Sequence, residues 1–161
     1  MLESFLQILI ILLAANGAPV VAALLLQSRG HLAIDLGRQL PDGHPLFGAS
    51  KTWRGLAAAL FASCALSLYF GYGLGFGLIA GALAMAGDLL SSFVKRRRGL
   101  APSARFRGGD QVPESLLPAI YATAFLGVDW WWAIIWSLSF TLIQMLVSRP
   151  LFWLHLRKRP Y

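Results

Sequence analysis

The chain has 161 residues, of which 57% are hydrophobic and 13% charged, and its 14 lysines and arginines against 7 acidic residues give a formal net charge of +7. Soluble globular domains average about 45–50% apolar and about 25% charged residues, so this composition excludes a disordered tail, a coiled coil and most soluble enzymes. The single cysteine, Cys64, excludes an internal disulfide framework and a multi-cysteine zinc site. We therefore expect one basic membrane domain over residues 1–161, with an anionic partner.

Five apolar segments follow one another along the chain. About 20 mostly apolar residues in a helix cross a bilayer core of about 30 Å, so each segment is expected to be a transmembrane helix. The expected spans are residues 5–26, 55–70, 73–94, 114–128 and 130–148. The predicted fold class is therefore all-α: an integral membrane protein with five transmembrane helices and two cytoplasmic loops that form a polar cavity.

The basic residues indicate how the chain is oriented in the membrane. All 14 fall between the first and second spans, between the third and fourth, or after the fifth. The positive-inside rule places these segments and the C-terminus in the cytoplasm and the N-terminus outside, in the inner or plasma membrane of the cell. Membrane lipids are thus expected partners, whereas nucleic acid is not, because few aromatic residues interleave with the basic clusters. The sequence leaves the oligomeric state open.

Small and helix-breaking residues mark particular places within the spans. Gly73, Gly77 and Gly81 are spaced four residues apart, which predicts a face on which helices pack closely. Asn16 and Pro19 lie in the middle of the first span, where proline frees a backbone carbonyl. This point is either a packing kink or a place where Asn16 binds a lipid or nucleotide group.

A glycine-rich turn ends the first cytoplasmic loop and brings polar side chains to the start of the second span. These side chains are Ser50, Lys51, Thr52 and Arg54. Helix N-termini present free N–H groups and a positive partial charge, so oxyanions bind there. The alternative is a solvated basic loop that serves only topology. Asp35 and Asp42, earlier in this loop, either join a metal site or form local contacts.

Asp88 lies near the cytoplasmic end of the third span, in an otherwise apolar segment. An acidic residue at the centre of a membrane helix costs about 2.5–3.5 kcal/mol on insertion scales, which makes it a functional candidate. At helical spacing Asp88 shares one face with Ser91, Ser92 and Lys95, and a hydrated cavity suits that face. The alternative is an internal ion pair between Asp88 and Lys95 or an arginine.

Asp110 and Glu114 stand four residues apart at the start of the short fourth span. Together with Asp88 they supply enough carboxylates for Mg²⁺, which takes one or two carboxylates plus substrate phosphates and water. Asp110 is otherwise a helix cap, and the role of Glu114 is left open.

The chain resembles the CDP-archaeol synthase family of CTP-dependent cytidylyltransferases, which are more distantly similar to phosphatidate cytidylyltransferase. The resemblance rests on five motifs in family order: Asn16-x-x-Pro19-Val20, Ile34-Asp35-x-Gly37-Arg38, Asp42-Gly43 through Phe47-Gly48-x-Ser50-Lys51-Thr52-Trp53-Arg54-Gly55, Gly87-Asp88-x-x-x-Ser92-Phe93-Val94-Lys95-Arg96-Arg97, and Asp110-Gln111. It implies a five-span enzyme that transfers CMP from CTP to a lipid phosphate with Mg²⁺ in a cytoplasm-facing cavity. The acceptor is expected to be an isoprenoid ether-lipid phosphate or a phosphatidate-like lipid.

The resemblance and the residue chemistry together give the expected roles. Asp88 and Asp110 are the expected metal ligands, and both, with Lys95, form the expected catalytic set. The side chains expected to bind the nucleotide and phosphates are Asn16, Ser50, Lys51, Thr52, Arg54, Ser92, Arg96 and Arg97. Anionic lipid headgroups are the other expected ligand of Arg97.

Two other functions compete with the enzyme. A non-catalytic membrane subunit would use its basic loops for docking, and a small carrier would use Asp88 as its polar site. The C-terminal segment, residues 154–161, departs from the family pattern.

Overall fold

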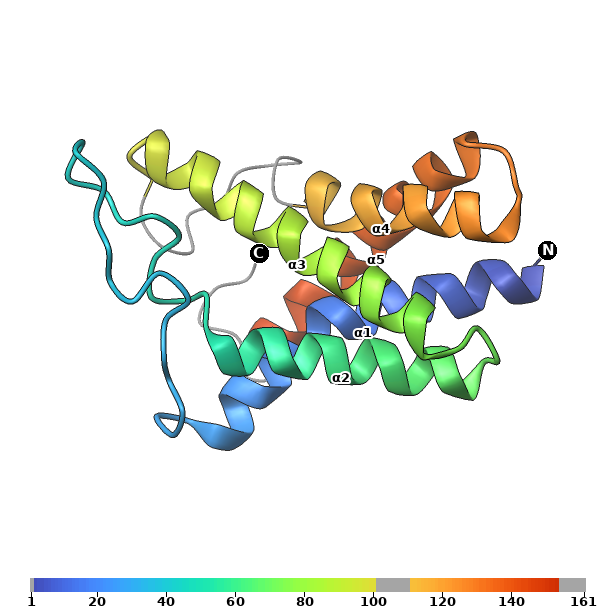
Figure 1. Cartoon of the computed structure of the whole chain (residues 1–161), viewed down its shortest axis with the longest axis horizontal. Coiled ribbons are helices and arrows are strands. Elements are labelled where there is room, and N and C mark those ends of the chain that lie inside the picture. Colours follow the sequence, from blue (N-terminus) through green and yellow to red (C-terminus); the bar gives the residue numbers. More distant parts are fainter. Residues whose placement is uncertain (1, 101–110, 154–161) are drawn as a thin grey trace.

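A computed structural model describes residues 2–100 and 111–153, with side chains described as far as residue 147. Within these ranges the chain forms five α-helices joined by loops and turns (Figure 1). Their bounds are α1 Leu2–Leu26, α2 Trp53–Tyr69, α3 Leu74–Arg97, α4 Gln111–Leu126 and α5 Trp131–Trp153. The helical fold agrees with the all-α expectation.

Successive helices pack against one another, and α1 also contacts α3, α4 and α5. Figure 1 shows the consequence: the turns that join α2 to α3 and α4 to α5 lie at the end that carries the N-terminus, and the long first loop lies at the other end beside the end of α3. The described part of the chain therefore has one end built from short turns and one end built from the first loop and helix termini.

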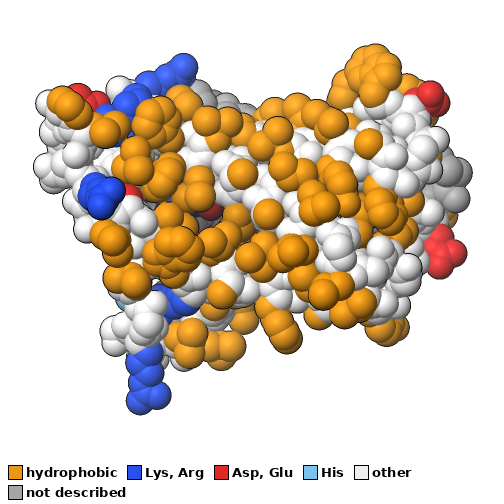
Figure 2. Space-filling view, in the orientation of Figure 1, with side chains coloured by type: hydrophobic (Ala, Val, Ile, Leu, Met, Phe, Trp, Pro, Cys, Tyr) orange, Lys and Arg blue, Asp and Glu red, His pale blue; other side chains and the backbone are white. Residues whose placement is uncertain are grey.

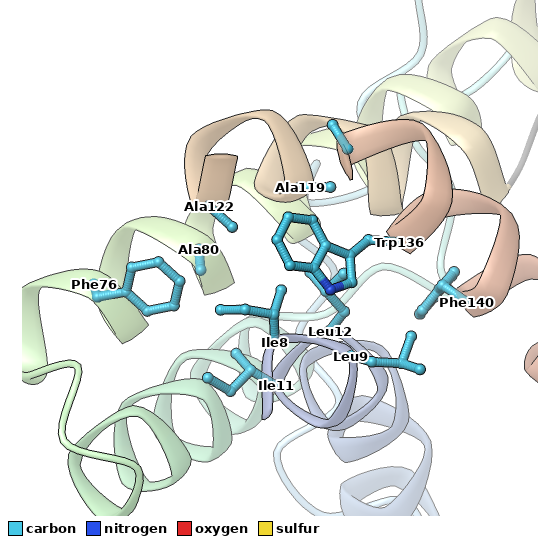
Figure 3. Packing of buried hydrophobic residues seen from close by; sticks show 11 residues of the cluster. Ile8, Leu9, Ile11, Leu12, Phe76, Ala80, Ala119, Ala122, Trp136 and Phe140 are labelled. Carbon is cyan, nitrogen blue, oxygen red and sulfur yellow. The ribbon is translucent and has the colours of Figure 1, made fainter. Parts of the chain in front are cut away.

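The core forms where α1 meets the other helices (Figure 3). Ile8, Ile11 and Leu12 of α1 are 1% exposed and pack in one cluster with Trp136 and Phe140 of α5. The Trp136 Nε1–H also donates a hydrogen bond of 3.0 Å to the carbonyl oxygen of Phe5, so the indole is satisfied although it is buried. α1 is continuous through Pro19, and the start of α2 packs there: a Cβ atom on Gly55 would lie 3.3 Å from the Pro19 Cβ.

Local chemistry explains why the helix bounds differ from the expected spans. α2 begins two residues earlier because Thr52 caps it, its hydroxyl accepting a hydrogen bond of 3.2 Å from the Gly55 N–H. α3 continues past residue 94 to Arg97, since basic residues favour the last turn of a helix. α4 ends at Leu126 because Gly127 adopts φ +64°, a left-handed conformation that stops helices.

Glycine brings α2 and α3 together, as the spacing of glycines predicted. A Cβ on Gly77 would lie 2.6 Å from the Cys64 Cα, and one on Gly81 would lie 2.8 Å from the Ser63 Oγ. Gly73 serves differently: it caps α3 at φ +85°, and its carbonyl accepts a hydrogen bond from the Ser67 hydroxyl. Small residues thus set the spacing between these two helices.

Apolar side chains also cover the outside of the helices. Figure 2 shows a broad apolar band on one face, with lysine and arginine at the end of the first loop and acidic residues but no basic ones at the opposite end of that face. Among the described residues, α1 and α3 are long and apolar enough to cross a membrane, while Trp53–Tyr69 and Trp131–Val147 are shorter apolar helices. The span count of five stays a prediction.

The close contact at Gly77 can be tested by adding one methyl group. We expect Gly77→Ala to destabilise the protein by about 1–3 kcal/mol, because the new Cβ meets α2 backbone atoms. Gly75→Ala is the matched control, since its Cβ has no neighbour within 4 Å. We expect that change to be neutral or to stabilise by about 0.5–1 kcal/mol. Thermal unfolding in detergent measures both, and equal unfolding temperatures would contradict the packing.

Candidate active site

The Asp88 carboxylate forms an ion pair with Lys51 of the first loop. The Lys51 Nζ lies 2.6 Å from both carboxylate oxygens, and the two side chains are 21% and 24% exposed. The pair therefore joins α3 to the residue that precedes the cap of α2. Sequence reasoning considered an internal partner for Asp88 on α3 or an arginine, but it did not identify Lys51.

Two serines and two basic residues follow Asp88 along the last turns of α3. Ser91 and Ser92 are 3% and 2% exposed, and the Ser91 hydroxyl donates to the Asp88 carbonyl oxygen at 2.9 Å. Lys95 is half-buried, whereas Arg96 is 4% exposed. Arg96 therefore brings a guanidinium into the interior at the end of α3.

Asp35 organises the first loop through hydrogen bonds to the backbone. One carboxylate oxygen accepts from the N–H groups of Phe47 and Gly48 at 2.9 and 2.7 Å, and the other accepts from Gly37 at 3.1 Å. Asp35 is 4% exposed. The left-handed backbone at Gly37 (φ +75°) and Gly48 (φ +94°) turns these N–H groups toward the carboxylate. Asp35 thus holds the two ends of this part of the loop together.

The pKa of Asp35 reflects two opposing effects. Burial raises the pKa, but the backbone hydrogen bonds from Gly48, Phe47 and Gly37 outweigh burial and hold it below its ordinary value. The ionised carboxylate is therefore the form that the folded loop stabilises. This arrangement supports a local structural role for Asp35 rather than membership of a metal site.

The residues around the start of α2 have distinct partners. Thr52 is 9% exposed and caps the helix, and Ser50 is exposed at the surface of the turn. Arg54 donates to the carbonyl oxygens of Gln27 and Arg29, at 2.7 and 2.5 Å. Arg54 therefore binds the backbone that follows α1, and it joins the ends of α1 and α2.

The first turn of α4 lies directly against α3 at Gly87. A Cβ on Gly87 would fall 2.1 Å from the Pro113 carbonyl oxygen, so only glycine fits there. This contact brings the beginning of α4 to the residue next to Asp88. Glu114, in the same turn, is 9% exposed. Asp110 and the rest of segment 101–110 lie outside the described residues, so the expected pairing of Asp88 with Asp110 is untested.

Arg97, at the end of α3, contacts the middle of the first loop. It forms an ion pair with Asp42 and donates to the carbonyl oxygens of His44 and Pro45 at 3.2 and 2.7 Å. Its guanidinium carbon also lies 5.3 Å from the centre of the Phe93 ring. The His44 backbone N–H, and after it the Arg97 guanidinium, hold the pKa of Asp42 below its ordinary value.

Asn16 lies within α1, and its side-chain amide donates to the Leu12 carbonyl oxygen at 3.0 Å. That bond leaves the amide oxygen and one N–H for other contacts. The expected role of Asn16 in binding a lipid or nucleotide group is untested.

The described residues suit a metal that is shared with a substrate. No group of three or more histidine, cysteine, aspartate or glutamate side chains within 2–100 and 111–147 could hold a metal ion by itself. Asp88, however, presents both carboxylate oxygens to a cationic group, the Lys51 ammonium. Mg²⁺ needs only one or two protein carboxylates when phosphates and water complete its coordination. The donor set at Asp88 fits that ion.

Sequence reasoning named Asp88 and the basic residues around it as candidates, but it did not predict the structural roles of Asp35 and Gly87. Asp35 was left between a metal ligand and a local role, although its place before a left-handed turn at Leu36 and Gly37 is where aspartate binds backbone N–H groups. Gly87 appeared only as part of the Gly87-Asp88 motif, and the sequence did not show its packing role, because that role depends on the approach of α4.

Known proteins resemble this chain in sequence and in structure. A family model described as CarS-like CDP-archaeol synthase matches residues 1–157. A CDP-archaeol synthase from Hyperthermus butylicus is 39% identical over 138 residues, which cover 78% of this chain and 76% of the relative. The CDP-archaeol synthase from Aeropyrum pernix is 33% identical, covering 80% of this chain and 75% of the relative. A solved structure described as an intramembrane enzyme for archaeal membrane lipids biosynthesis superposes with a TM-score of 0.71 and 27% identity, covering 88% of this chain and 90% of that one.

The hydrogen bonds of the Asp35 carboxylate predict that the stability of the fold depends on pH, and a variant at this position can isolate that dependence. Because the folded pKa lies below the ordinary value of 3.8, the ionised carboxylate stabilises the fold above that value, and this stabilisation is lost as the pH falls through the folded pKa. We expect Asp35→Asn to lower the unfolding temperature at pH 7 by roughly 2–6 °C. The difference from wild type should shrink as the pH is lowered below 3.8. Thermal unfolding from pH 7 to pH 3 measures this, and Asp129→Asn, at an exposed turn, is the control.

Proposed function

The chain belongs to the CDP-archaeol synthase family, and from this premise we propose which of its residues perform the reaction. The protein is an integral membrane enzyme that transfers CMP from CTP to a lipid phosphate, forming a CDP-activated lipid. We propose an isoprenoid ether-lipid phosphate as the acceptor, since the curated relatives are named for CDP-archaeol. A phosphatidate-like lipid is the competing acceptor.

The single observation that carries the assignment of the site is the Asp88–Lys51 pair. It sets a carboxylate, with both oxygens directed at a cation, at the end of the molecule where the basic residues gather, and the buried Arg96 lies two turns further along the same helix. A nucleoside triphosphate and a lipid phosphate both carry negative charge, so this end suits them electrostatically. The acceptor would reach it from the membrane, with its tails along the apolar sides of the helices and its phosphate at the basic end.

The reaction asks the protein mainly to position and neutralise charge. An oxygen of the lipid phosphate attacks the α-phosphorus of CTP, the bond from that phosphorus to the β-phosphate bridging oxygen breaks, and pyrophosphate leaves with the bonding electrons. No side chain has to form a covalent bond, because orientation and electrostatic stabilisation supply most of the catalysis in such transfers. When bound, Mg²⁺ would offset the charge that develops on the triphosphate oxygens.

Asp88 would hold that ion together with Asp110. The contact between Gly87 and the backbone of Pro113 supports this pairing, since it brings the start of α4 next to Asp88, and Asp110 directly precedes α4 in the sequence. Glu114, in the first turn of α4, is also buried. Lys51 would turn its ammonium from Asp88 toward the triphosphate when the nucleotide arrives.

The remaining polar residues divide between binding and support. Lys95 and Arg96 would hold the phosphates of CTP and lipid, with the Ser92 hydroxyl on the same helix. Ser50 and the Thr52 hydroxyl stand at the N-terminus of α2, where a phosphate oxygen is favoured. Arg54 would act by holding the ends of α1 and α2 together, because its contacts are to backbone carbonyls.

We propose that all five helices cross the membrane with the N-terminus outside and the basic end in the cytoplasm. The separation of basic residues from the opposite end in Figure 2 and the antiparallel order of the helices support this orientation. CTP is a cytoplasmic substrate, so the orientation also places the site on the side where its nucleotide is found.

The proposed function is tested with purified protein in detergent. Labelled CTP, Mg²⁺ and a panel of lipid phosphates should give a CDP-lipid and pyrophosphate, with an isoprenoid ether-lipid phosphate preferred over phosphatidate. Absence of product with every acceptor would favour a docking subunit, and transport by proteoliposomes without CTP would favour a carrier.

The role of Asp88 has a sharper test in a variant that keeps its size. We expect Asp88→Asn to lower the rate of cytidylyl transfer by at least about 10²-fold, since a positioned charge contributes several kcal/mol in such sites. Asp129→Asn, at the opposite end of the fold, should retain the wild-type rate. The assay is product formation at saturating CTP, with size-exclusion chromatography to show that both variants fold. Equal activity in the Asp88 variant would falsify the assignment.

A further inference from the structure

We propose that Arg97 is a positioning residue: it docks the turn formed by residues 42–48 on the end of α3 and thereby sets the geometry of the nucleotide site. This inference rests on the proposed function and changes the role of Arg97 from a phosphate ligand to a support. The turn of residues 42–48 is called the docked turn below.

Within the described part of the chain, the polar and ring contacts of Arg97 are to the docked turn or to α3 itself. One terminal nitrogen pairs with Asp42, the other donates to the carbonyl oxygens of His44 and Pro45, and the Phe93 ring lies beside the guanidinium. A planar guanidinium offers donors in a fixed fork, so several acceptors at once hold it in one orientation. A second contact lies nearby, where the His44 ring approaches within 3.9 Å of the position a Gly99 Cβ would take.

The docked turn is held together by hydrogen bonds within it and to the residues just before it. Asp35 binds its last N–H groups, and Arg97 attaches it to α3. The Asp42 carboxylate accepts from the His44 N–H at 3.1 Å, and Gly43 adopts φ +76°. The backbone of Leu40 bonds to His44, and Leu46 bonds back to Arg38. The turn therefore moves as one unit when its attachment to α3 is lost.

The docked turn leads directly to the catalytic groups. Its last residue, Gly48, lies against Arg96, where a Cβ would be 3.9 Å from the Arg96 Cδ. The Gly48 carbonyl then accepts from the Lys51 N–H at 3.1 Å, and the Lys51 ammonium reaches Asp88. By attaching the turn to α3, Arg97 thus helps to fix the position of Gly48 against Arg96 and the position of the Lys51 backbone, from which the ammonium reaches Asp88.

The solvent exposure of the Asp42–Arg97 ion pair indicates that the pair matters for the position of the turn rather than for the stability of the fold. Asp42 is 41% and Arg97 23% exposed, and ion pairs at this exposure contribute little to global stability. A guanidinium whose charge is already matched by a carboxylate also attracts a triphosphate less than a free one. Loss of the pair should therefore change nucleotide binding while the fold persists.

The test compares Arg97→Gln, Asp42→Asn and the double variant in the purified full chain, with Arg98→Gln as the matched control. Asp42→Asn keeps the side-chain oxygen that accepts from His44 but removes the charge that pairs with Arg97. We expect each single variant to raise KM for CTP roughly 5- to 10-fold, with kcat changed less than about 2-fold. Because the two residues act through one contact, the double variant should be no worse than the worse single variant. Arg98→Gln should match wild type.

A second readout does not depend on activity. Arg38 is exposed beside the docked turn, so trypsin cleavage after Arg38 should be several-fold faster in both single variants, relative to cleavage after Arg29. Unchanged cleavage after Arg38 would overturn the docking role. Faster cleavage with an unchanged KM for CTP would overturn the positioning role.

The KM for CTP of the Asp42→Asn variant distinguishes a supporting role of Arg97 from direct binding of phosphate by Arg97. If Arg97 binds phosphate itself, this variant leaves KM for CTP unchanged or lowers it, and the proposal is wrong. If the wild-type protein forms no CDP-lipid at all, the proposed function fails, and the cleavage rates still decide whether Arg97 docks the turn.

Discussion

A carboxylate near the end of a mostly apolar helix requires a cation, and that requirement organises the basic end of this protein. Asp88 meets it through Lys51, which belongs to the first loop rather than to any neighbouring turn of α3. The loop must therefore return from the end of α1 to the side of α3 before α2 begins. The folded loop, the cap at Thr52 and the contact of Arg54 with the end of α1 are consistent with that path.

The helices allow this path because small residues bring them close together at two places along α3. At Gly77 and Gly81, α3 packs closely against α2. At Gly87, one residue from Asp88, α4 packs closely against α3. Any side chain at Gly87 would separate the start of α4 from Asp88 and widen the site. Close packing and the chemistry at Asp88 thus depend on neighbouring positions of a single helix.

Much of this arrangement could be predicted from the sequence, for reasons that are local. Apolar segments predicted the helices, the distribution of charge predicted a basic end, and a lone aspartate in an apolar run indicated the candidate site. The partner of Asp88 could not be predicted, because Lys51 is distant in the chain and a loop's path follows from tertiary contacts. For the same reason Arg97 was expected at phosphates or headgroups, although the structure places it on Asp42. The helix bounds were off by a few residues where caps and glycines, rather than hydropathy, set the end.

The two kinds of basic side chain at this end of the protein, arginine and lysine, differ in what they can do. Arg54 and Arg97 are planar donors, and each holds two backbone carbonyls, so their positions are fixed by several bonds at once. Lys51 carries a compact ammonium on a flexible stem, and among the described residues its ammonium pairs with Asp88. Such a group can change partner by rotation about its side-chain bonds, without movement of the backbone. The arginines therefore suit the framework of the site, and the lysine would suit the proposed step in which an arriving triphosphate takes the place of a carboxylate.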